Sequence, residues 1–523
     1  MSRLPLALAL LVASLGACTT PKPRLSADKS PGGYSYAVNL RHLEQGRLRV
    51  NVVVPPSAAQ QAVFVFPKLV PGIYGNLSFG QYVADFTAYD RQNRPLAVVR
   101  QDTNRWVIAD AGRLHHLTYL VAPTWREFVV TDAKSAPFYR SAGSSYHPDS
   151  AFVLNYSTFV GYFEDQRPRP YEVRFTKPAG FYGASHLTPA PVNDSVEVVR
   201  APSYAELVDA PLLYARPDTA WLQVGATRVL VALYDATSKQ PYAPVLARAL
   251  KTMLEAQRAY LGGTLPVANY SFLVYHTTGP KGLRIGDGLE HSHSTLVLQE
   301  SPDLQDLSKV LPPIAAHEFF HIVTPLNIHA EQIEQYDFLQ PTFSEHLWLY
   351  EGLTEYATIH FPIRGGLETL PEFLATLERK AKAMSKYDNT LSLTQLSRNV
   401  AARQDQIYNF YLKGALFNLC LDIRLRELSG GKMGTQQLTQ QLLRRYGPHT
   451  PFADDQLFDV LTQLTYPEMR PFFRDYLEDG KPLPLAETLA KVGLLYDPTT
   501  YNIRVAAQPT PAQLALRQSW IGQ

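Results

Sequence analysis

Residues 312–327 read PPIAAHEFFHIVTPLN, an apolar run interrupted by three ionisable side chains. The apolar spacing predicts a helix over about residues 307–324. Residues four apart on a helix share one face, so the imidazoles of His317 and His321 project together, with Glu318 beside them. This H-E-x-x-H spacing predicts two zinc ligands and a general base. The alternative is a pair of core histidines satisfied by backbone or carboxylate partners.

A catalytic zinc site usually takes a third protein ligand and leaves its fourth position to water. One class of zinc peptidase would carry a histidine at position 327, but that residue is Asn327, which excludes the class. Glu351 lies in the apolar segment LWLYEGLTEYA, early in a helix predicted over about 344–359. Burying an unpaired carboxylate there would be costly, and binding to a dication removes that cost. We therefore predict Glu351 as the third ligand; the alternative is a surface glutamate.

Residues 34–200 have the pattern of a β domain. Short segments rich in Val, Tyr and Phe, partly alternating, are separated by turn residues. Strands are predicted in segments 34–40, 47–54, 61–66, 82–90, 105–110 and 117–122. Strands at this spacing predict an all-β, sandwich-like domain.

Helices predominate from about residue 240. Residues 241–263 have helical apolar spacing, an early proline and a terminal Gly-Gly pair. Strands are predicted at 270–276 and 294–300, and further helices over about 368–386, 408–427, 434–445 and 454–477. We expect a multidomain chain with a β domain (34–200), an α+β catalytic domain (201–430), a helical C-terminal region (431–481) and an irregular tail (482–523).

The first residues predict export. Arg3 precedes a short apolar stretch, and Leu15-Gly16-Ala17-Cys18 resembles the bacterial lipobox. The resemblance implies a signal peptide over residues 1–17, lipidation of Cys18 and a flexible tether over 18–33. Neither of the two residues directly after Cys18 is Asp, which by analogy favours the outer over the inner membrane. The alternative is an ordinary secretory signal.

The charge composition argues against a nucleic-acid-binding protein, and the cysteine count argues against a disulfide. Charged residues make up 18% of the chain and the formal net charge is +2, so nothing points to nucleic acid. Besides Cys18, the single cysteine is Cys420 in an apolar helical run, where we expect a small core residue. With Cys18 lipidated, no disulfide is expected.

Three motifs in order, HEFFH, WLYEGLTEY and YLKGALFNLCLDIRLR, resemble the glycyl aminopeptidase family of zinc peptidases, which is related to the aminopeptidase N group. PKLVPGIYGNLSFGQYVADFTA resembles the N-terminal region of that family. The resemblance implies a thermolysin-like zincin catalytic domain after the β domain. Many members carry a C-terminal PDZ domain, but too few residues remain here, so we expect none or a remnant.

The resemblance also implies site residues. His317, His321 and Glu351 match the zinc ligands, one ion per chain, and Glu318 matches the base that activates water. Tyr411, in YLKG, matches the tyrosine that donates to the oxyanion of the tetrahedral intermediate; the alternative is a packing aromatic. Such a donor is worth a few kcal/mol.

Residues 287–294, DGLEHSHS, resemble the segment of the family that binds the substrate N-terminus. Glu290 would hold the free α-amino group, and the strand around Gly288 would present its backbone to the peptide. The alternative for Glu290 is an edge-strand residue that prevents aggregation. Asp287 replaces a family glycine, which alters the amine pocket or adds a second acid. His291 and His293 line the cleft or bind a second metal; we favour cleft lining.

The expected activity is zinc-dependent removal of small N-terminal residues, Gly or Ala, from peptides with a free N-terminus. Two alternatives remain open: an endopeptidase on the same site, and a catalytically silent lipoprotein that only binds. Glu355, one turn after Glu351, either orients a ligand imidazole or is a solvated helix residue.

Overall fold

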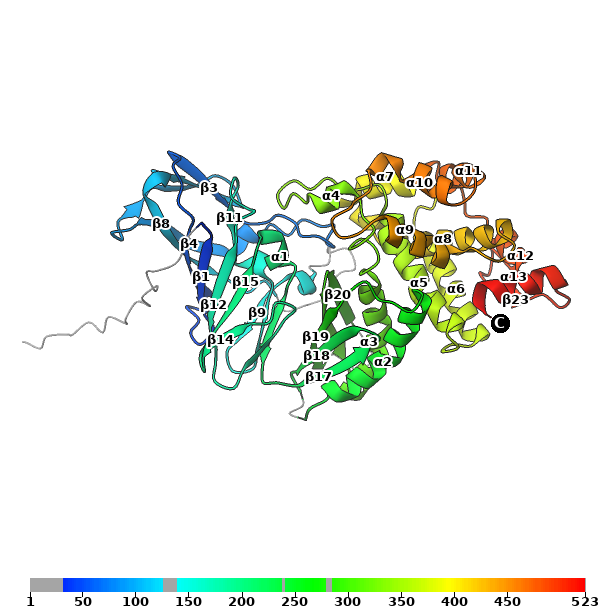
Figure 1. The fold of residues 1–523 in the computed structure, drawn as a ribbon, viewed down its shortest axis with the longest axis horizontal. Helices are drawn as coiled ribbons and strands as arrows, with labels where there is room; N and C mark the ends of the chain where they lie inside the picture. Colours follow the sequence, from blue (N-terminus) through cyan, green and yellow to red (C-terminus); the bar gives the residue numbers. More distant parts are fainter. Residues whose placement is uncertain (1–31, 126–138, 238–239, 279–284, 523) are drawn as a thin grey trace, which may run out of the picture.

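The computed structural model describes residues 32–125, 139–237, 240–278 and 285–522. A β domain, a central sheet with helices and a helical region follow one another along the chain and lie side by side (Figure 1). The predicted signal peptide, Cys18 and nearly all of the tether lie outside the described residues. Within these ranges, no helix combines the length and hydropathy needed to cross a bilayer.

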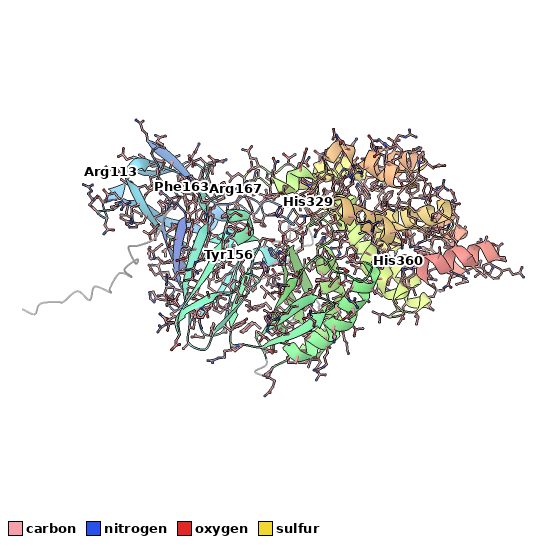
Figure 2. All side chains as sticks on the ribbon, viewed as in Figure 1. Arg113, Tyr156, Phe163, Arg167, His329 and His360 are labelled. Atoms are coloured by element: carbon pink, nitrogen blue, oxygen red, sulfur yellow. The ribbon has the colours of Figure 1, made fainter. Side chains whose placement is uncertain are left out.

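Three sheets that share one core make up the β domain, which confirms the sandwich-like prediction. Aromatic side chains from all three, including Tyr36, Phe64 and Phe152, fill the core together with Tyr156 (labelled in Figure 2). Along β1 and β2 alternate side chains are buried, as expected for strands with one face on a core. The largest sheet contains, in spatial order, β14 (Ala190–Asn193), β15 (Val196–Ala201), β12 (Tyr171–Thr176), β1 (Tyr34–Asn39), β2 (Leu48–Val53), β8 (Leu114–Val121), β4 (Val83–Asp90) and β5 (Pro95–Leu96). The smaller sheets contain β11 (Tyr162–Phe163), β3 (Gln61–Val65), β7 (Arg105–Ala109) and β6 (Val98–Arg100), and β13 (Tyr182–Ala184), β16 (Leu212–Ala215), β10 (Ala151–Leu154) and β9 (Ser145–His147).

The β domain extends beyond the boundary expected at residue 200. All four residues of β16 are buried, and the strand pairs with β10 and β13. The short helix α1 (Tyr204–Val208) also packs Tyr204 and Leu207 into the β core. This helix interrupts the strand pattern, so the sequence-based boundary fell too early.

The central sheet has five strands, in the order β17 (Thr219–Val224), β18 (Thr227–Asp235), β19 (Asn269–Thr278), β21 (Ser294–Ser301) and β20 (Ile285–His291). β18, β19 and β21 are parallel, and β20 is the antiparallel edge strand. One face packs on helices α2 (Ala243–Tyr260) and α3 (Leu304–Phe320). Leu230, Leu273 and Leu296 on the other face pack against Val153 and Leu213 of the β domain. The two domains therefore meet through an apolar contact.

Helices complete the chain, as predicted, but two of them differ from the prediction. The segment expected to be helical over 454–477 is divided at residues 465–468, and the helix expected over 344–359 is different in kind. Residues Trp348–Leu353 form a π-helix, η5, which continues into α5 (Thr354–Arg364). π-Helical turns occur frequently at functional sites. The others are α4 (Glu331–Glu334), α6 (Leu370–Met384), α7 (Leu393–Arg398), α8 (Asn409–Leu428), α9 (Thr435–Arg445), α10 (Leu457–Leu464) and α11 (Met469–Phe473), which leads into the π-turn η9 (Arg474–Glu478).

The tail expected to be irregular is regular and packed. It forms α12 (Leu485–Lys491), the hairpin β22 (Leu494–Tyr496) and β23 (Ile503–Val505), and α13 (Pro511–Ile521). Trp520 of α13 is fully buried, and its carbonyl oxygen accepts from His360 Nε2 on α5 at 2.9 Å (His360 is labelled in Figure 2). The N-cap Thr510, followed by a proline, is a helix-start signal that the proline content of the segment obscured.

Candidate metal centre and active site

The two histidines of the H-E-x-x-H segment lie side by side at the end of α3. The helix ends at Phe320, earlier than predicted, and His321 is its C-cap. Its φ of −61° and ψ of −14° remain helical, so its ring stays one turn from that of His317, 4.9 Å between centroids.

Each imidazole is oriented through its Nδ1 atom. His317 Nδ1 lies 2.8 Å from Glu355 Oε2, and His321 Nδ1 lies 2.9 Å from the carbonyl oxygen of Thr324. Both partners are acceptors, so both Nδ1 atoms donate. Each Nε2 lone pair therefore faces the centre of the site, as a metal ligand requires.

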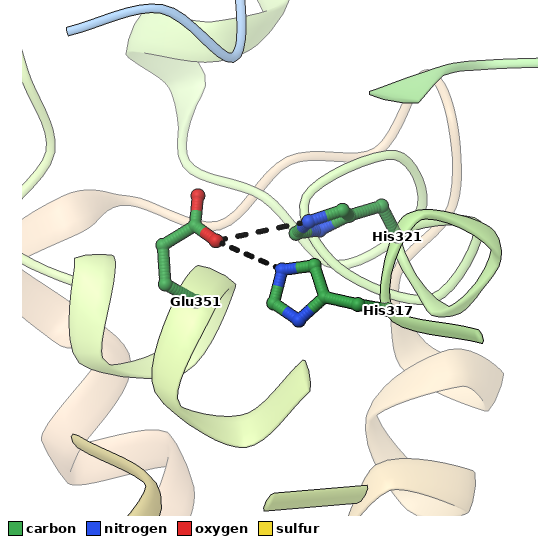
Figure 3. A group of neighbouring side chains, drawn as sticks. All are labelled: His317, His321 and Glu351. Carbon is green, nitrogen blue, oxygen red and sulfur yellow. Dashed lines mark hydrogen bonds and ion pairs between the residues drawn. The ribbon is translucent and has the colours of Figure 1, made fainter. Parts of the chain in front are cut away.

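Glu351, on the π-helix, supplies the third group. Its Oε2 atom lies 3.4 Å from His317 Nε2 and 3.7 Å from His321 Nε2 (Figure 3). Four donors about 2.0–2.1 Å from a tetrahedral zinc ion lie about 3.4 Å apart. These residues therefore fit a zinc ion in donor type, orientation and spacing.

Two glycines bring η5 and α8 into backbone contact. A Cβ on Gly352 would lie 2.8 Å from the Gly414 backbone, so neither position has room for a side chain. Asn418 Nδ2 bridges the same elements by donating to the Trp348 carbonyl oxygen at 3.1 Å. Tyr411, one turn before Gly414, is thereby held at a fixed distance from Glu351.

Glu355 contacts the imidazole of His317 and is not a solvated helix residue. Besides its contact with His317, its carboxylate pairs with the Lys380 ammonium from α6. Burial alone would raise the pKa of Glu355, but Lys380 and the hydrogen bond from His317 lower it to about 2. A permanent carboxylate there increases the electron density on the ring.

Glu318 faces the same centre from α3 and is 9% exposed. Burial raises its pKa to about 8, with Glu290 and Glu351 adding to the rise and His317 opposing it. A Cβ on Gly288 would lie 2.5 Å from Glu318 Oε1, so only glycine lets β20 approach this carboxylate. Gly288, predicted to meet substrate, therefore also packs against the predicted base.

Tyr411 lies in the first turn of α8 with its ring centroid 5.5 Å from that of His317. Burial and the carboxylates of Glu351 and Glu318 raise its pKa well above that of an ordinary phenol. The hydroxyl therefore stays protonated at neutral pH and can donate a hydrogen bond.

Glu290 is near the metal trio, as the amine-binding prediction requires. Its carboxylate, that of Glu318 and a His321 nitrogen all lie within 4.8 Å of one another. Asp287 is engaged elsewhere, because its carboxylate accepts from the amide and the hydroxyl of Ser141, both at 2.9 Å. It therefore serves to join β20 to the β domain.

His291 and His293 contact different partners. His291 Nδ1 lies 3.4 Å from Asp209 Oδ1, and the ring of His293 stacks on that of His186 at 4.2 Å. Among the described residues, neither histidine belongs to a group of donors close enough to share an ion.

Tyr74 of the β domain is a site residue that the sequence did not reveal. Its hydroxyl donates to Glu351 Oε1 at 2.8 Å, opposite the oxygen that faces the imidazoles. Its segment, PKLVPGIYGN, resembles the family, but no spacing rule links it to the zinc motif.

Glu345, His346 and Asp454 form a further group of donors near enough to share an ion, and it contains none of the residues described above. However, His346 Nδ1 accepts from the Trp348 indole at 3.1 Å and its Nε2 donates to the Asp454 carbonyl oxygen at 2.8 Å. With both ring nitrogens occupied, the histidine has no lone pair to offer a metal.

Two family models match the chain, one in its N-terminal half and one in its C-terminal half. The model of the peptidase M61 N-terminal domain matches residues 35–216, and that of the M61 glycyl aminopeptidase matches residues 311–417. Together they cover more than half of the sequence. The chain belongs to the M61 peptidase family. It is therefore a metallopeptidase of the aminopeptidase type, as the resemblance predicted.

Solved structures show the same fold. An aminopeptidase N family protein from Idiomarina loihiensis superposes with a TM-score of 0.75 at 21% identity, over 88% of this chain and 78% of that one. An M1 zinc metallopeptidase from Deinococcus radiodurans superposes with a TM-score of 0.53 at 15% identity, over 87% of this chain and 95% of that one. A mutant of that metallopeptidase, bound to a Tyr-Ser-Ala substrate, superposes with a TM-score of 0.50 at 15% identity, over 87% of this chain and 94% of that one. No curated protein matches the chain.

Proposed function

We propose that this M61 peptidase is a zinc aminopeptidase that removes small residues, Gly or Ala, from peptides with a free N-terminus. The observation that supports this best is the placement of Glu290 within 4.8 Å of Glu318 and His321. The α-nitrogen and carbonyl carbon of one residue are about 2.5 Å apart. An ammonium on Glu290 therefore places the first peptide bond, and no later one, at the zinc ligands.

The charge of the pocket favours cations. Glu290, Glu318 and Glu351 converge there, and burial together with the neighbouring Glu351 carboxylate raises the pKa of Glu290. An arriving ammonium offsets this repulsion, and a charge-assisted hydrogen bond to Glu290 then fixes the substrate N-terminus.

His317, His321 and Glu351 would hold the zinc ion, which supplies a Lewis acid that polarises the scissile carbonyl and acidifies water. Glu318 accepts the proton of the attacking water and passes it to the leaving amine. The protonated Tyr411 hydroxyl donates to the oxyanion that develops on the former carbonyl oxygen. The preference for Gly rests on the description of the matching family as glycyl aminopeptidases, and Ala is included because its side chain is the next smallest.

Acetylation of the substrate N-terminus is expected to reduce kcat/KM by about 30-fold or more. Loss of a buried, charged hydrogen bond costs about 2–5 kcal/mol, because Glu290 is left unpaired. The test compares Gly, Ala and Leu reporter substrates with free and acetylated N-termini. Glu290→Gln is the companion variant and should reduce cleavage of free substrates only. Equal cleavage of both forms would instead identify an endopeptidase.

We also propose that the chain is exported as a bacterial lipoprotein anchored to the cell envelope through Cys18, with the outer membrane favoured. The support is the Leu15-Gly16-Ala17-Cys18 sequence after an apolar stretch. Wild-type protein should sediment with membranes and incorporate labelled fatty acid, whereas Cys18→Ser should do neither. Soluble wild-type protein without label would exclude the anchor.

A further inference from the structure

A loop of the β domain, residues 67–79, projects into the catalytic site. Its neck is closed by backbone hydrogen bonds: the Ser78 amide donates to the Lys68 carbonyl and the Phe79 amide to that of Pro67, each at 3.0 Å. A compact loop with joined ends is an Ω-loop, a form that frequently carries function. The blue segment after β3 runs towards the catalytic region in Figure 1.

The tip of this loop contacts the cores of both domains. Ile73 is buried in the β-domain core together with Leu289 of β20, while Tyr74 belongs to the core of the catalytic domain. From the far side, Gln404 Nε2 donates to the Tyr74 carbonyl oxygen at 2.8 Å, and the Phe343 ring lies 6.2 Å from that of Tyr74. The tip is therefore held on several sides.

Tyr74 acts on the zinc ligand Glu351. Its buried hydroxyl donates to Oε1 at 2.8 Å, which leaves Oε2 directed at the two Nε2 atoms. A partner of this kind fixes the orientation of a ligating carboxylate, and its loss typically lowers metal affinity by about 10- to 100-fold.

Gly72 acts on Glu290. Its φ of +79° favours glycine, and a Cβ there would lie 2.7 Å and 2.8 Å from the two carboxylate oxygens of Glu290 and 2.6 Å from Leu289 Cδ1. The Glu290 carboxylate therefore packs directly against the backbone of Gly72, where a side chain would displace it.

We propose that the Ω-loop 67–79 is a positioning element of the peptidase site, in which Tyr74 aims Glu351 at the metal and Gly72 sets the place of Glu290. The proposal rests on the proposed function, because it assumes that Glu351 binds zinc and Glu290 binds the substrate amine. It assigns to the β domain a part in catalysis: the site is complete only when the loop tip is docked.

The two contacts predict separate defects. Tyr74→Phe removes one hydroxyl and should weaken zinc binding about 10- to 100-fold, with KM unchanged once zinc is saturating. Gly72→Ala should displace the Glu290 carboxylate and raise KM for free-amine substrates at least tenfold, with zinc affinity unchanged.

Matched controls separate these effects from general destabilisation. Tyr119→Phe removes a buried hydroxyl whose donation to the Phe159 carbonyl oxygen is also 2.8 Å, within the β-domain core. Gly46→Ala imposes the same backbone strain, since Gly46 has a φ of +76°, but no atom lies within 4 Å of its would-be Cβ. Both controls should leave zinc affinity and KM unchanged.

The experiment uses the full-length protein. Zinc affinity is measured by competition with a chromophoric chelator, the Co²⁺-substituted protein is examined by visible absorption, and kcat and KM are measured at saturating zinc. Tyr74→Phe should shift the Co²⁺ bands as the carboxylate reorients. Test variants that match their controls in affinity, spectrum and KM would overturn the proposal.

Failure of the proposed function gives a different result. If wild-type protein cleaves acetylated and free substrates equally, the role of Glu290 is wrong whatever Gly72→Ala does. If wild type requires a free amine yet Gly72→Ala behaves like Gly46→Ala, the loop proposal alone is wrong.

Discussion

Replacing Glu318 by glutamine is expected to lower kcat by about 10³- to 10⁴-fold, with zinc content unchanged at one ion per chain. Glutamine keeps the shape of the side chain but cannot accept a proton, and general acid–base catalysis contributes up to about 10⁴-fold. The proposed zinc ligands His317 and His321 lie one residue before and three residues after Glu318, and they keep their own partners, Glu355 and the Thr324 carbonyl oxygen.

The same substitution should not destabilise the protein. Without a bound cation, burial together with Glu290 and Glu351 raises the pKa of Glu318 to about 8, so a neutral side chain suits this position in the metal-free protein at neutral pH. A dication bound beside it would favour the carboxylate that the base needs. A group with a raised acid pKa opposes folding above its unfolded-state pKa, and an amide removes that opposition. Activity and stability should therefore change in opposite directions, or stability should stay the same.

The measurements are steady-state kinetics, metal analysis and thermal unfolding of the variant. Glu345→Gln is the matched control: it is the same chemical change at a buried glutamate that pairs with Arg398. It should leave kcat within about twofold of wild type. If Glu318→Gln turned over at the wild-type rate, another group would have to be the base.

The pairing of His317 with His321 could be predicted because the helical period converts sequence spacing directly into position. Glu351 could be proposed from its apolar neighbours, and the structure brings its carboxylate to these rings. The π-helix that carries it could not be predicted, since no propensity distinguishes it from an α-helix in this segment.

Tyr74 was beyond prediction for a different reason. Its contact with Glu351 joins residues 277 positions apart and depends on how two domains pack. Gly72 likewise reads as half of a Pro-Gly turn, and its role emerges only when β20 lies beside it. Local patterns predict elements, whereas contacts between domains depend on the assembled cores.

Substituting Glu351 by glutamine is expected to weaken zinc binding by at least about 100-fold, or about 2.7 kcal/mol. Glu351 is the single anionic member of the proposed ligand set, and an amide oxygen carries no charge to attract a dication. Its two imidazole partners would remain, but two neutral ligands hold zinc poorly. Activity should be lost in parallel and return in part at high zinc concentration.

Comparing the zinc content and zinc affinity of Glu351→Gln with those of Glu345→Gln shows which donor group binds the ion. Glu345 belongs to a separate donor group, with His346 and Asp454, whose histidine has both nitrogens hydrogen-bonded. Glu345→Gln should therefore keep one zinc per chain and wild-type affinity by chelator competition. Loss of zinc from Glu345→Gln, with retention in Glu351→Gln, would move the metal to the other group. Because Glu318 and Tyr411 face Glu351 and not Glu345, the mechanism would then lack its metal and would have to be abandoned.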